Sequence, residues 1–290
     1  MKARYGPWAV VAGASEGIGA AFAVALAKQD LDLVLVARRP GPLADLAARL
    51  PVRTVTVSAD LADGIEAVLA ATDGLDVGLV VCNAAYAPVG PFLDADPAET
   101  RRALELNCAV PLALAHAYLP AMAARGRGGF VVMSSLAGQQ GSPGIAAYAA
   151  TKAFGAVLAE GLWGELRGHG VDVVTAVAGA VATPGLEHAR RRPAPGTVGP
   201  DEVVAAALKA LGHRPRTVPG AFMKVSAAAM GRLLPRRAAI ALMGRANAAI
   251  VDTLRAYGTA RCPRSPRGVA ATRTPPVRRS GRPCQRSASG

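Results

Sequence analysis

Residues 8–19 read WAVVAGASEGIG, a short apolar run that breaks into a glycine-rich turn. An alanine-rich stretch with helical character follows from Ala20 to Gln29. Strand, glycine turn and helix in this order suit a pyrophosphate, because glycines allow close backbone approach and the helix amino end presents free N–H groups and a positive dipole. The spacing is GxxxGxG, and tight strand-to-helix turns use glycine even without a ligand. By itself the stretch therefore predicts the local fold and leaves the ligand open.

A basic pair follows the second apolar stretch, residues 32–36, which predicts another strand. An NAD-binding fold often has an acid at this point to hold the ribose hydroxyls, whereas an arginine fork grips a 2′-phosphate through paired hydrogen bonds. Arg38, with Arg39 beside it, therefore indicates NADP(H). The alternative is a solvated charge pair at a strand end, and Glu16 in the glycine turn is a mild argument against the phosphate.

Tyr148 and Lys152 are four residues apart, and Ser135 precedes Tyr148 by thirteen residues. On a helix, this spacing puts the phenol and the ammonium on one face, about one turn apart. We expect the cation to lower the pKa of Tyr148, so that the phenol can exchange a proton with an alcohol or carbonyl, while Ser135 holds the substrate oxygen. Read alone, the Tyr–Lys pair is more typical of a solvated helix face, because a tyrosine and a lysine four residues apart are common by chance.

With these pieces in register, the chain resembles the short-chain dehydrogenase/reductase family from about Trp8 to about Ala210. The TGxxxGxG turn of that family corresponds to residues 12–19, and its NNAG segment to residues 82–85. The resemblance implies a catalytic tetrad of Asn107, Ser135, Tyr148 and Lys152, in which Asn107 supports a proton-relay water and Lys152 also holds the ribose. The cofactor-binding residues implied are Gly13, Ser15, Gly17, Ile18, Gly19, Arg38, Asp60, Leu61, Asn83, Tyr148, Lys152 and Thr183.

Three positions depart from the family pattern: Ala12 replaces a threonine, Cys82 replaces an asparagine, and Ala178 replaces a proline. The first two changes remove side-chain hydrogen bonds that brace the turn, at about 1 kcal/mol each. None of the three removes a reacting group, so we expect activity with a weakened hold on the cofactor.

The order of elements predicts the fold class. Strands alternate with helices from Trp8 to about Val177, and 290 residues with 51% hydrophobic content can bury one full core. We expect an α/β protein with a Rossmann-type doubly wound parallel sheet, helices on both faces and a single domain over residues 1–257. A substrate lid should lie at about 183–250, with a helix at 200–211.

Positive charge is concentrated at the end of the chain. The formal net charge is +13, and residues 261–290 hold eight arginines, several prolines and no acid. Such a segment cannot bury a core, so we expect residues 258–290 to form a disordered basic tail. It could attract polyanions weakly, but we expect no dedicated nucleic-acid partner. The preference for arginine beside alanine, glycine and proline is typical of a GC-rich bacterial genome.

The four cysteines and four histidines show no metal-ligand spacing, so no metal site is expected. Residues 1–4 superficially imitate a secretory signal, but the apolar residues after them belong to the first strand. We expect no apolar run to approach the length of roughly 20 residues that is needed to cross a membrane. A cytoplasmic location is also expected.

These observations predict an NADP(H)-preferring oxidoreductase that interconverts a ketone and a secondary alcohol, with Tyr148 as general acid/base. Acyl thioesters, steroids and small ketones all remain open as substrates. The methionines, leucines and arginines of residues 222–245 suit core or a homo-dimer or tetramer interface first, a substrate wall next and a membrane surface last. The alternative is a non-catalytic NADP(H)-sensing regulatory or scaffold protein whose basic tail binds a partner.

Overall fold

The structure is a computed structural model that describes residues 1–183 and 196–261. Residues 188–192, expected in the substrate lid, and residues 262–290 of the expected tail lie outside this part of the chain.

Seven strands form one sheet in the order β3-β2-β1-β4-β5-β6-β7, and every neighbouring pair is parallel. The strands are β1 (Trp8–Ala12), β2 (Asp32–Ala37), β3 (Thr54–Ser58), β4 (Val77–Cys82), β5 (Gly128–Ser135), β6 (Val171–Ala178) and β7 (Arg216–Thr217). The order reverses between β1 and β4, and in doubly wound sheets such a switch point opens a ligand crevice at the carboxyl ends of the strands. The expected fold class is confirmed.

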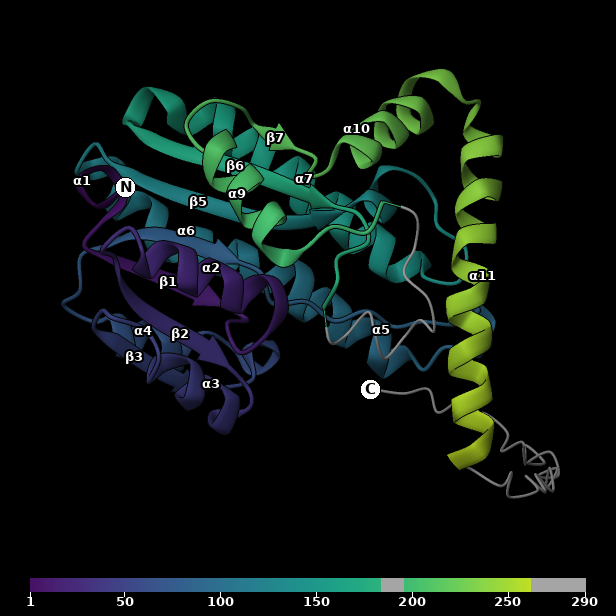
Figure 1. The fold of residues 1–290 in the computed structure, drawn as a ribbon, viewed down its shortest axis with the longest axis horizontal. Helices are drawn as coiled ribbons and strands as arrows, with labels where there is room; N and C mark the ends of the chain where they lie inside the picture. Colours follow the sequence, from purple (N-terminus) through teal and green to yellow (C-terminus); the bar gives the residue numbers. More distant parts are fainter. Residues whose placement is uncertain (184–195, 262–290) are drawn as a thin grey trace, which may run out of the picture.

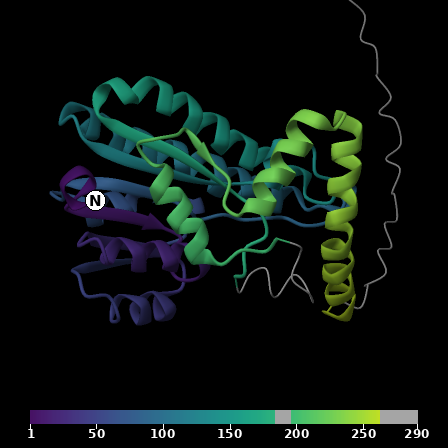
Figure 2. The same cartoon turned by 45° about the horizontal axis from the view of Figure 1, so that its top comes forward.

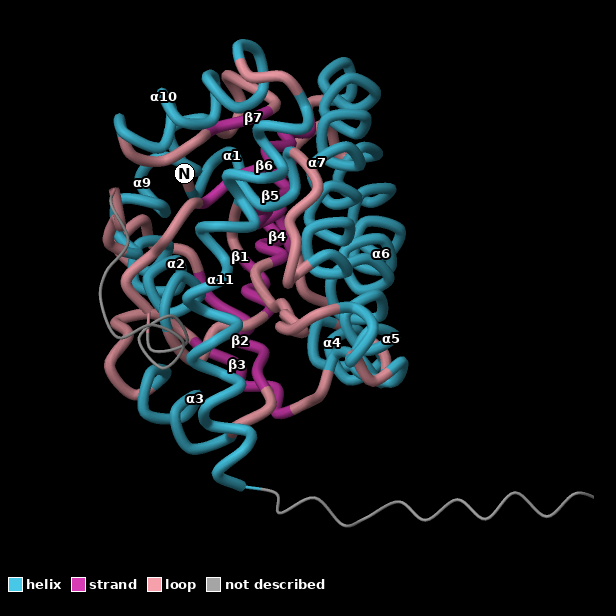
Figure 3. Tube along the Cα trace, turned by 90° about the vertical axis from the view of Figure 1, so that its right-hand side faces the viewer, coloured by secondary structure: helices cyan, strands magenta, loops and turns pink. Residues whose placement is uncertain are grey.

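Helices cover both faces of the sheet, as Figure 3 shows with the sheet seen edge-on. One face carries α2 (Gly17–Ala27), α3 (Pro40–Ala47) and α9 (Pro200–Ala210). The opposite face carries α4 (Glu66–Thr72), α5 (Pro97–Leu104), α6 (Val110–Ala124) and α7 (Ala146–Leu166), with a π-helical turn, η3 (Glu105–Ala109), joining α5 to α6. Side chains of successive strand residues point alternately to the two faces of the sheet. Val11 packs against the helices of the first face, and Val10 packs against those of the second. Strands buried on both faces read as continuous apolar runs, as the sequence of β1 does.

The remaining elements lie outside these layers. They are α1 (Lys2–Tyr5), α10 (Ala221–Ala228), α11 (Arg236–Arg261), the 3₁₀ turns η1 (Leu61–Asp63), η2 (Phe92–Asp94), η4 (Leu136–Gln139) and η5 (Arg167–His169), and the π turn η6 (Ala229–Leu233). Helix α11 stands at the carboxyl-end side of the sheet, apart from the other helices (Figures 1 and 2). It extends to Arg261, past the expected start of the tail at 258, because no proline interrupts the chain before Pro263.

Element boundaries move by a few residues from those expected. Helix α2 begins at Gly17, inside the glycine turn, and ends at Ala27. Three residues later, Asp30 has a left-handed backbone with φ of 58°. Helix α9 begins at Pro200 as expected, since proline is favoured in the first helical turn.

The expectation about membrane-length apolar runs is wrong. Residues 97–124 form a helix long and apolar enough, by length and composition, to cross a membrane. Half of its most apolar window is buried inside the fold, and Leu114 and Met122 are fully buried against the sheet. Its hydrophobicity therefore fits the core helix of a two-sided sheet.

Candidate active site

The glycine turn after β1 is shaped by close backbone contacts. Gly13 has φ of 87°, and a Cβ added there would lie 2.7 Å from the backbone of Ala84. A Cβ on Gly19 would lie 1.9 Å from the Gly13 carbonyl oxygen and 2.7 Å from Asn83 Nδ2. Asn83 Nδ2 donates a hydrogen bond to the Gly13 carbonyl at 2.8 Å, which braces the turn against the end of β4. Any side chain at position 13 or 19 would fill the cradle that a phosphate needs.

A cleft of about 320 Å³ opens over this turn at the switch point of the sheet. It is lined by the residues predicted to hold the cofactor on its adenine and phosphate side, namely Gly13, Ser15, Gly17, Ile18, Arg38, Asp60, Leu61, Asn83 and Thr183. A neighbouring cavity of about 230 Å³ is lined by Ser135, Tyr148 and Lys152. Both spaces share Ile18, Asn83, Ala85 and Thr183. The two spaces adjoin, and the glycine cradle at one end and the proton-carrying groups at the other fit a dinucleotide.

The charges around the adenine end differ from the expected arrangement in one respect. Glu16 is paired with Arg39, at 2.5 Å between the carboxylate and the guanidinium. The exposed Arg38 lines the cleft, and its charge acts on Asp60. The one acid of the glycine turn is therefore countered by Arg39, which weakens the argument that Glu16 raised against a 2′-phosphate.

Asp60 is held by protein groups. One carboxylate oxygen accepts from Ala62 N at 3.1 Å, and the other accepts from the Arg102 guanidinium. Desolvation is the largest single effect on the pKa of Asp60 and would raise it, but these hydrogen bonds and the charges of Arg102 and Arg38 together hold the pKa below its ordinary value. The pairing of Asp60 with Arg102 could not be predicted from local sequence, because the two residues are 42 positions apart.

Tyr148 and Lys152 lie in the first two turns of α7, as the spacing predicts. The expected lowering of the Tyr148 pKa is wrong: burial raises it, and the hydrogen bond with Ser135 opposes this shift only in part. Lys152 Nζ lies 5.8 Å from the centre of the Tyr148 ring and donates to the Met133 carbonyl at 2.9 Å. Because Lys152 is only 6% exposed, desolvation lowers its own pKa to about 8. Burial, which the sequence does not show, outweighs the pairing of charges here.

Asn107 is buried in the π turn η3 rather than on the cavity wall. Its side chain accepts from Tyr86 N and donates to Tyr86 O, both at 2.8 Å, and donates to Thr151 Oγ1 at 2.9 Å. Thr151 in turn donates to the Tyr148 carbonyl at 2.8 Å. Pro111 has no N–H and cannot donate to the Asn107 carbonyl four residues earlier. Asn107 thus ties the segment after β4 to the helix that carries Tyr148, and sequence reasoning missed both partners, Tyr86 and Thr151.

The structure shows what surrounds each of the three residues that depart from the family pattern. The Ala12 carbonyl accepts from Asn83 N at 3.1 Å and from Ala84 N at 2.7 Å, so backbone groups brace the turn there. Cys82 is buried, and desolvation raises the pKa of its thiol. After Ala178, Gly179 is overlaid by Met223 of α10, whose sulfur would lie 2.6 Å from an added Cβ. Weaker cofactor binding stays a prediction.

No group of three or more His, Cys, Asp or Glu side chains that could hold a metal ion occurs among the described residues. Cys82 and Cys108 are both free thiols.

Comparison with known proteins gives consistent results. The family model described as short chain dehydrogenase matches residues 7–194. A 7beta-hydroxysteroid dehydrogenase of Clostridium sardiniense is 33% identical over 190 residues, which cover 63% of this chain and 73% of the relative. A very-long-chain 3-oxoacyl-CoA reductase of Podospora anserina is 34% identical over 220 residues, which cover 72% of this chain and 64% of that longer relative.

Solved structures agree with the sequence matches. A 7beta-hydroxysteroid dehydrogenase studied for its stereoselectivity superimposes with a TM-score of 0.78 at 29% identity, covering 83% of this chain and 98% of its own. A short-chain dehydrogenase from Sphingobium yanoikuyae in complex with NADPH gives a TM-score of 0.68 at 29% identity, covering 92% of this chain and 98% of its own.

Proposed function

This chain belongs to the short-chain dehydrogenase family and is an oxidoreductase, and we propose that it is an NADP(H)-preferring enzyme that interconverts a ketone and a secondary alcohol. The observation that carries the proposal is the cavity lined by Ser135, Tyr148 and Lys152, which shares four wall residues with the glycine-turn cleft. A proton donor and a dinucleotide cradle therefore open into one continuous site.

Tyr148 is the proposed proton donor. Its raised pKa keeps the phenol protonated near neutral pH, which is the form that can donate to a carbonyl oxygen. The Ser135 hydroxyl, hydrogen-bonded to Tyr148, is placed to bind the same oxygen. When bound, the nicotinamide supplies or accepts the hydride. The reverse reaction uses the same groups, but it needs Tyr148 as the phenolate, the form left after it has donated its proton, to take the proton from the alcohol.

Lys152 and Asn107 support this reaction in different ways. Lys152 lines the cavity with its ammonium held by the Met133 carbonyl, from which it can reach a ribose hydroxyl. The Asn107 main-chain carbonyl is proposed to hold a water that relays protons from solvent toward Lys152, as the family resemblance implies.

The preference for NADP(H) rests on Arg38. Its side chain is exposed at the wall of the cleft, and the acid of the glycine turn is already paired with Arg39. A planar guanidinium suits a 2′-phosphate. The similar protein from Sphingobium yanoikuyae, which was solved with NADPH, supports the same choice.

The substrate is proposed to be a bulky small molecule. The relatives are named for hydroxysteroids and very-long-chain 3-oxoacyl thioesters, both of which place the reacting oxygen on a large apolar framework. We also propose a homo-oligomer, because Phe154 and Val157 of α7 are apolar side chains that are 40% and 67% exposed.

NADPH oxidation over a panel of ketones tests the proposal. Tyr148→Phe should leave NADPH affinity nearly intact while turnover falls by roughly 10²-fold or more, the usual contribution of a general acid. Ser135→Ala should lower turnover without changing NADPH affinity. Tyr118→Phe is the matched control, since the Tyr118 hydroxyl contacts Thr72 at 2.7 Å and lines neither space. Full turnover by Tyr148→Phe on a ketone that the unmodified enzyme reduces would exclude the phenol as the acid.

A further inference from the structure

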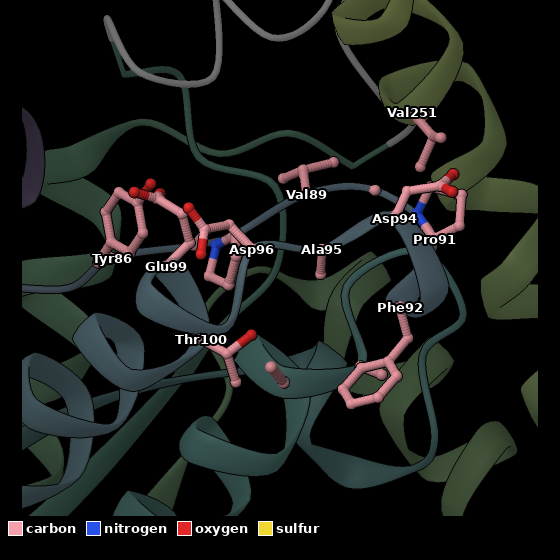
Figure 4. A pocket seen from close by; sticks show the side chains of 15 residues that line it. Tyr86, Val89, Pro91, Phe92, Asp94, Ala95, Asp96, Glu99, Thr100 and Val251 are labelled. Carbon is pink, nitrogen blue, oxygen red and sulfur yellow. The ribbon is translucent and has the colours of Figure 1, made fainter. Parts of the chain in front are cut away.

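A third cavity, of about 990 Å³, lies between residues 86–100, the start of α7 and the helix α11 (Figure 4). Two of its lining residues are sequence neighbours of residues that line the candidate active site. Tyr86 lines it directly after Ala85, which lines both spaces of the candidate active site. Ala147 lines it directly before Tyr148. Its size lies at the upper end of the range for small-molecule sites.

The walls of this cavity are fixed by contacts between distant segments. Gly90 N donates to the Gly144 carbonyl at 2.8 Å, which joins the segment after β4 to the loop before α7. Asn247 of α11, only 4% exposed, donates to the Pro143 carbonyl at 3.1 Å, and Val251 lines the cavity. Helix α11 lies beyond residues 7–194, the part that matches the family model.

Carboxylates gather at one end of the cavity. In the view of Figure 4, Asp96 and Glu99 lie beside Tyr86, while Phe92 and Val251 lie toward the other end. Asp96 is the N-cap of α5 and accepts from Ala98 N at 2.9 Å, and Glu99, three residues later, falls on the same side of the helix. Asp94, the third acid of the lining, lies at the other end beside Val251 (Figure 4).

No lysine or arginine is among the lining residues of this cavity in the described part of the chain. Arg102 lies 5.8 Å from the centre of the Tyr86 ring, but its guanidinium is hydrogen-bonded to Asp60. The charge of Arg102 acts on Glu99 as well as on Asp60. Among the described lining residues, Asp96 and Glu99 still leave an excess of negative charge beside Tyr86.

We propose that this cavity is the substrate chamber and that it selects uncharged carbonyl compounds with a large apolar framework over counterparts that carry a carboxylate. The inference rests on the proposed function. An anionic substrate would bring its charge toward the carboxylates of Asp96 and Glu99, and like charges repel. A neutral framework meets the apolar side chains of Phe92 and Val251 and is repelled by none of the carboxylates in the lining.

The test compares three forms of one 7-oxosteroid, with a side-chain carboxylate, its methyl ester and its carboxamide, by calorimetric titration into the full chain with NADP⁺ present. The ester and the carboxamide should both bind about tenfold more tightly than the carboxylate. In Asp96→Asn/Glu99→Gln, in which asparagine still caps α5, the difference should shrink to less than about threefold. The matched control is Asp30→Asn/Asp73→Asn, which removes two exposed acids that precede β2 and β4, at the amino ends of the strands. It should keep the full difference in affinity between the carboxylate and the two uncharged forms.

Equal affinity for all three forms, failure of all three to bind, or a difference that persists in Asp96→Asn/Glu99→Gln would each overturn the inference. Turnover with NADPH is measured separately on the same compounds. Charge selection in binding without any turnover would leave the chamber standing and refute the proposed function. Reduction of all three forms, bound with equal affinity, would support the proposed function and refute the charge selection by this cavity. Raising the ionic strength should narrow the difference in the unmodified protein, since salt screens charge repulsion.

Discussion

Gly19→Ala is the most direct test of the cofactor cradle. The added methyl would lie 1.9 Å from the Gly13 carbonyl oxygen and 2.7 Å from Asn83 Nδ2, and both distances are below the 3.0 Å that Cβ contacts essentially never pass. The first clash is with backbone, so no rotamer change relieves it, and the turn must open by about 1 Å or more. We expect the free energy of unfolding to fall by roughly 1–3 kcal/mol, the usual cost of overpacking. NADPH affinity should fall by about 10- to 100-fold, the value of one or two charge-assisted hydrogen bonds.

Urea denaturation measures the stability term, and fluorescence titration with NADPH measures the affinity. Gly161→Ala is the matched control, because nothing lies within 4 Å of its added methyl and the residue sits in the interior of helix α7. That variant should keep NADPH affinity and gain about 0.5–1 kcal/mol, since alanine loses less entropy than glycine in a helix. If Gly19→Ala kept both the stability and the NADPH affinity of the unmodified protein, the close approach of Gly19 to Gly13 would not shape the site as described.

Three further predictions concern charge and stability. Burial lowers the pKa of Lys152 to about 8 from an ordinary 10.5, so between these values the unfolded chain binds protons that the native state does not. Relative to Lys152→Met, the unmodified protein should therefore gain roughly 3 kcal/mol of unfolding free energy from pH 8 to 10.5, and a flat difference in pH-dependent urea melts would contradict this. Arg38→Asp should weaken NADPH binding by about 1.5–3 kcal/mol and raise the relative use of NADH in fluorescence titrations, whereas equal affinity of the unmodified protein for both cofactors would speak against the assignment. Tyr5→Phe removes the 2.7 Å hydrogen bond to Asp172 that ties α1 to β6, so it should cost about 1.5–3 kcal/mol in urea melts, and a loss below about 0.5 kcal/mol would show that the contact is dispensable.

Much of the fold could be predicted because its signals are local. The apolar run of β1, the glycines that follow it and the alternation of strands with helices each depend on residues close in sequence, and the sheet confirms them. The four-residue spacing of Tyr148 and Lys152 belongs to the same class, since helix geometry alone places them on one face. The expectation that no apolar stretch reaches the length of a membrane span failed at the helix of residues 97–124. This helix is half buried inside the fold, and a core helix can have the same length and composition as a membrane span.

The electrostatics of the site could not be predicted in the same way. The sign of the Tyr148 pKa shift depends on how far the phenol is withdrawn from water, and the ordinary pairing argument favoured the opposite direction. Likewise, the pairing of Asp60 with Arg102 and of Glu16 with Arg39 joins residues that are distant in sequence. Burial and long-range pairing arise only when the layers assemble.

By itself the sequence determined the fold class and the placement of Tyr148 and Lys152 on one helix, because periodicity, glycine geometry and residue spacing act over one or two turns of chain. Tertiary structure alone decided the shape and charge of the large cavity. Its acids come from η2 and the start of α5, and its far wall comes from α11. The loop before α7 joins them through Gly144 and Pro143. Those segments are separated by tens to more than a hundred residues, and only the packing of the helices around the sheet brings them within contact distance.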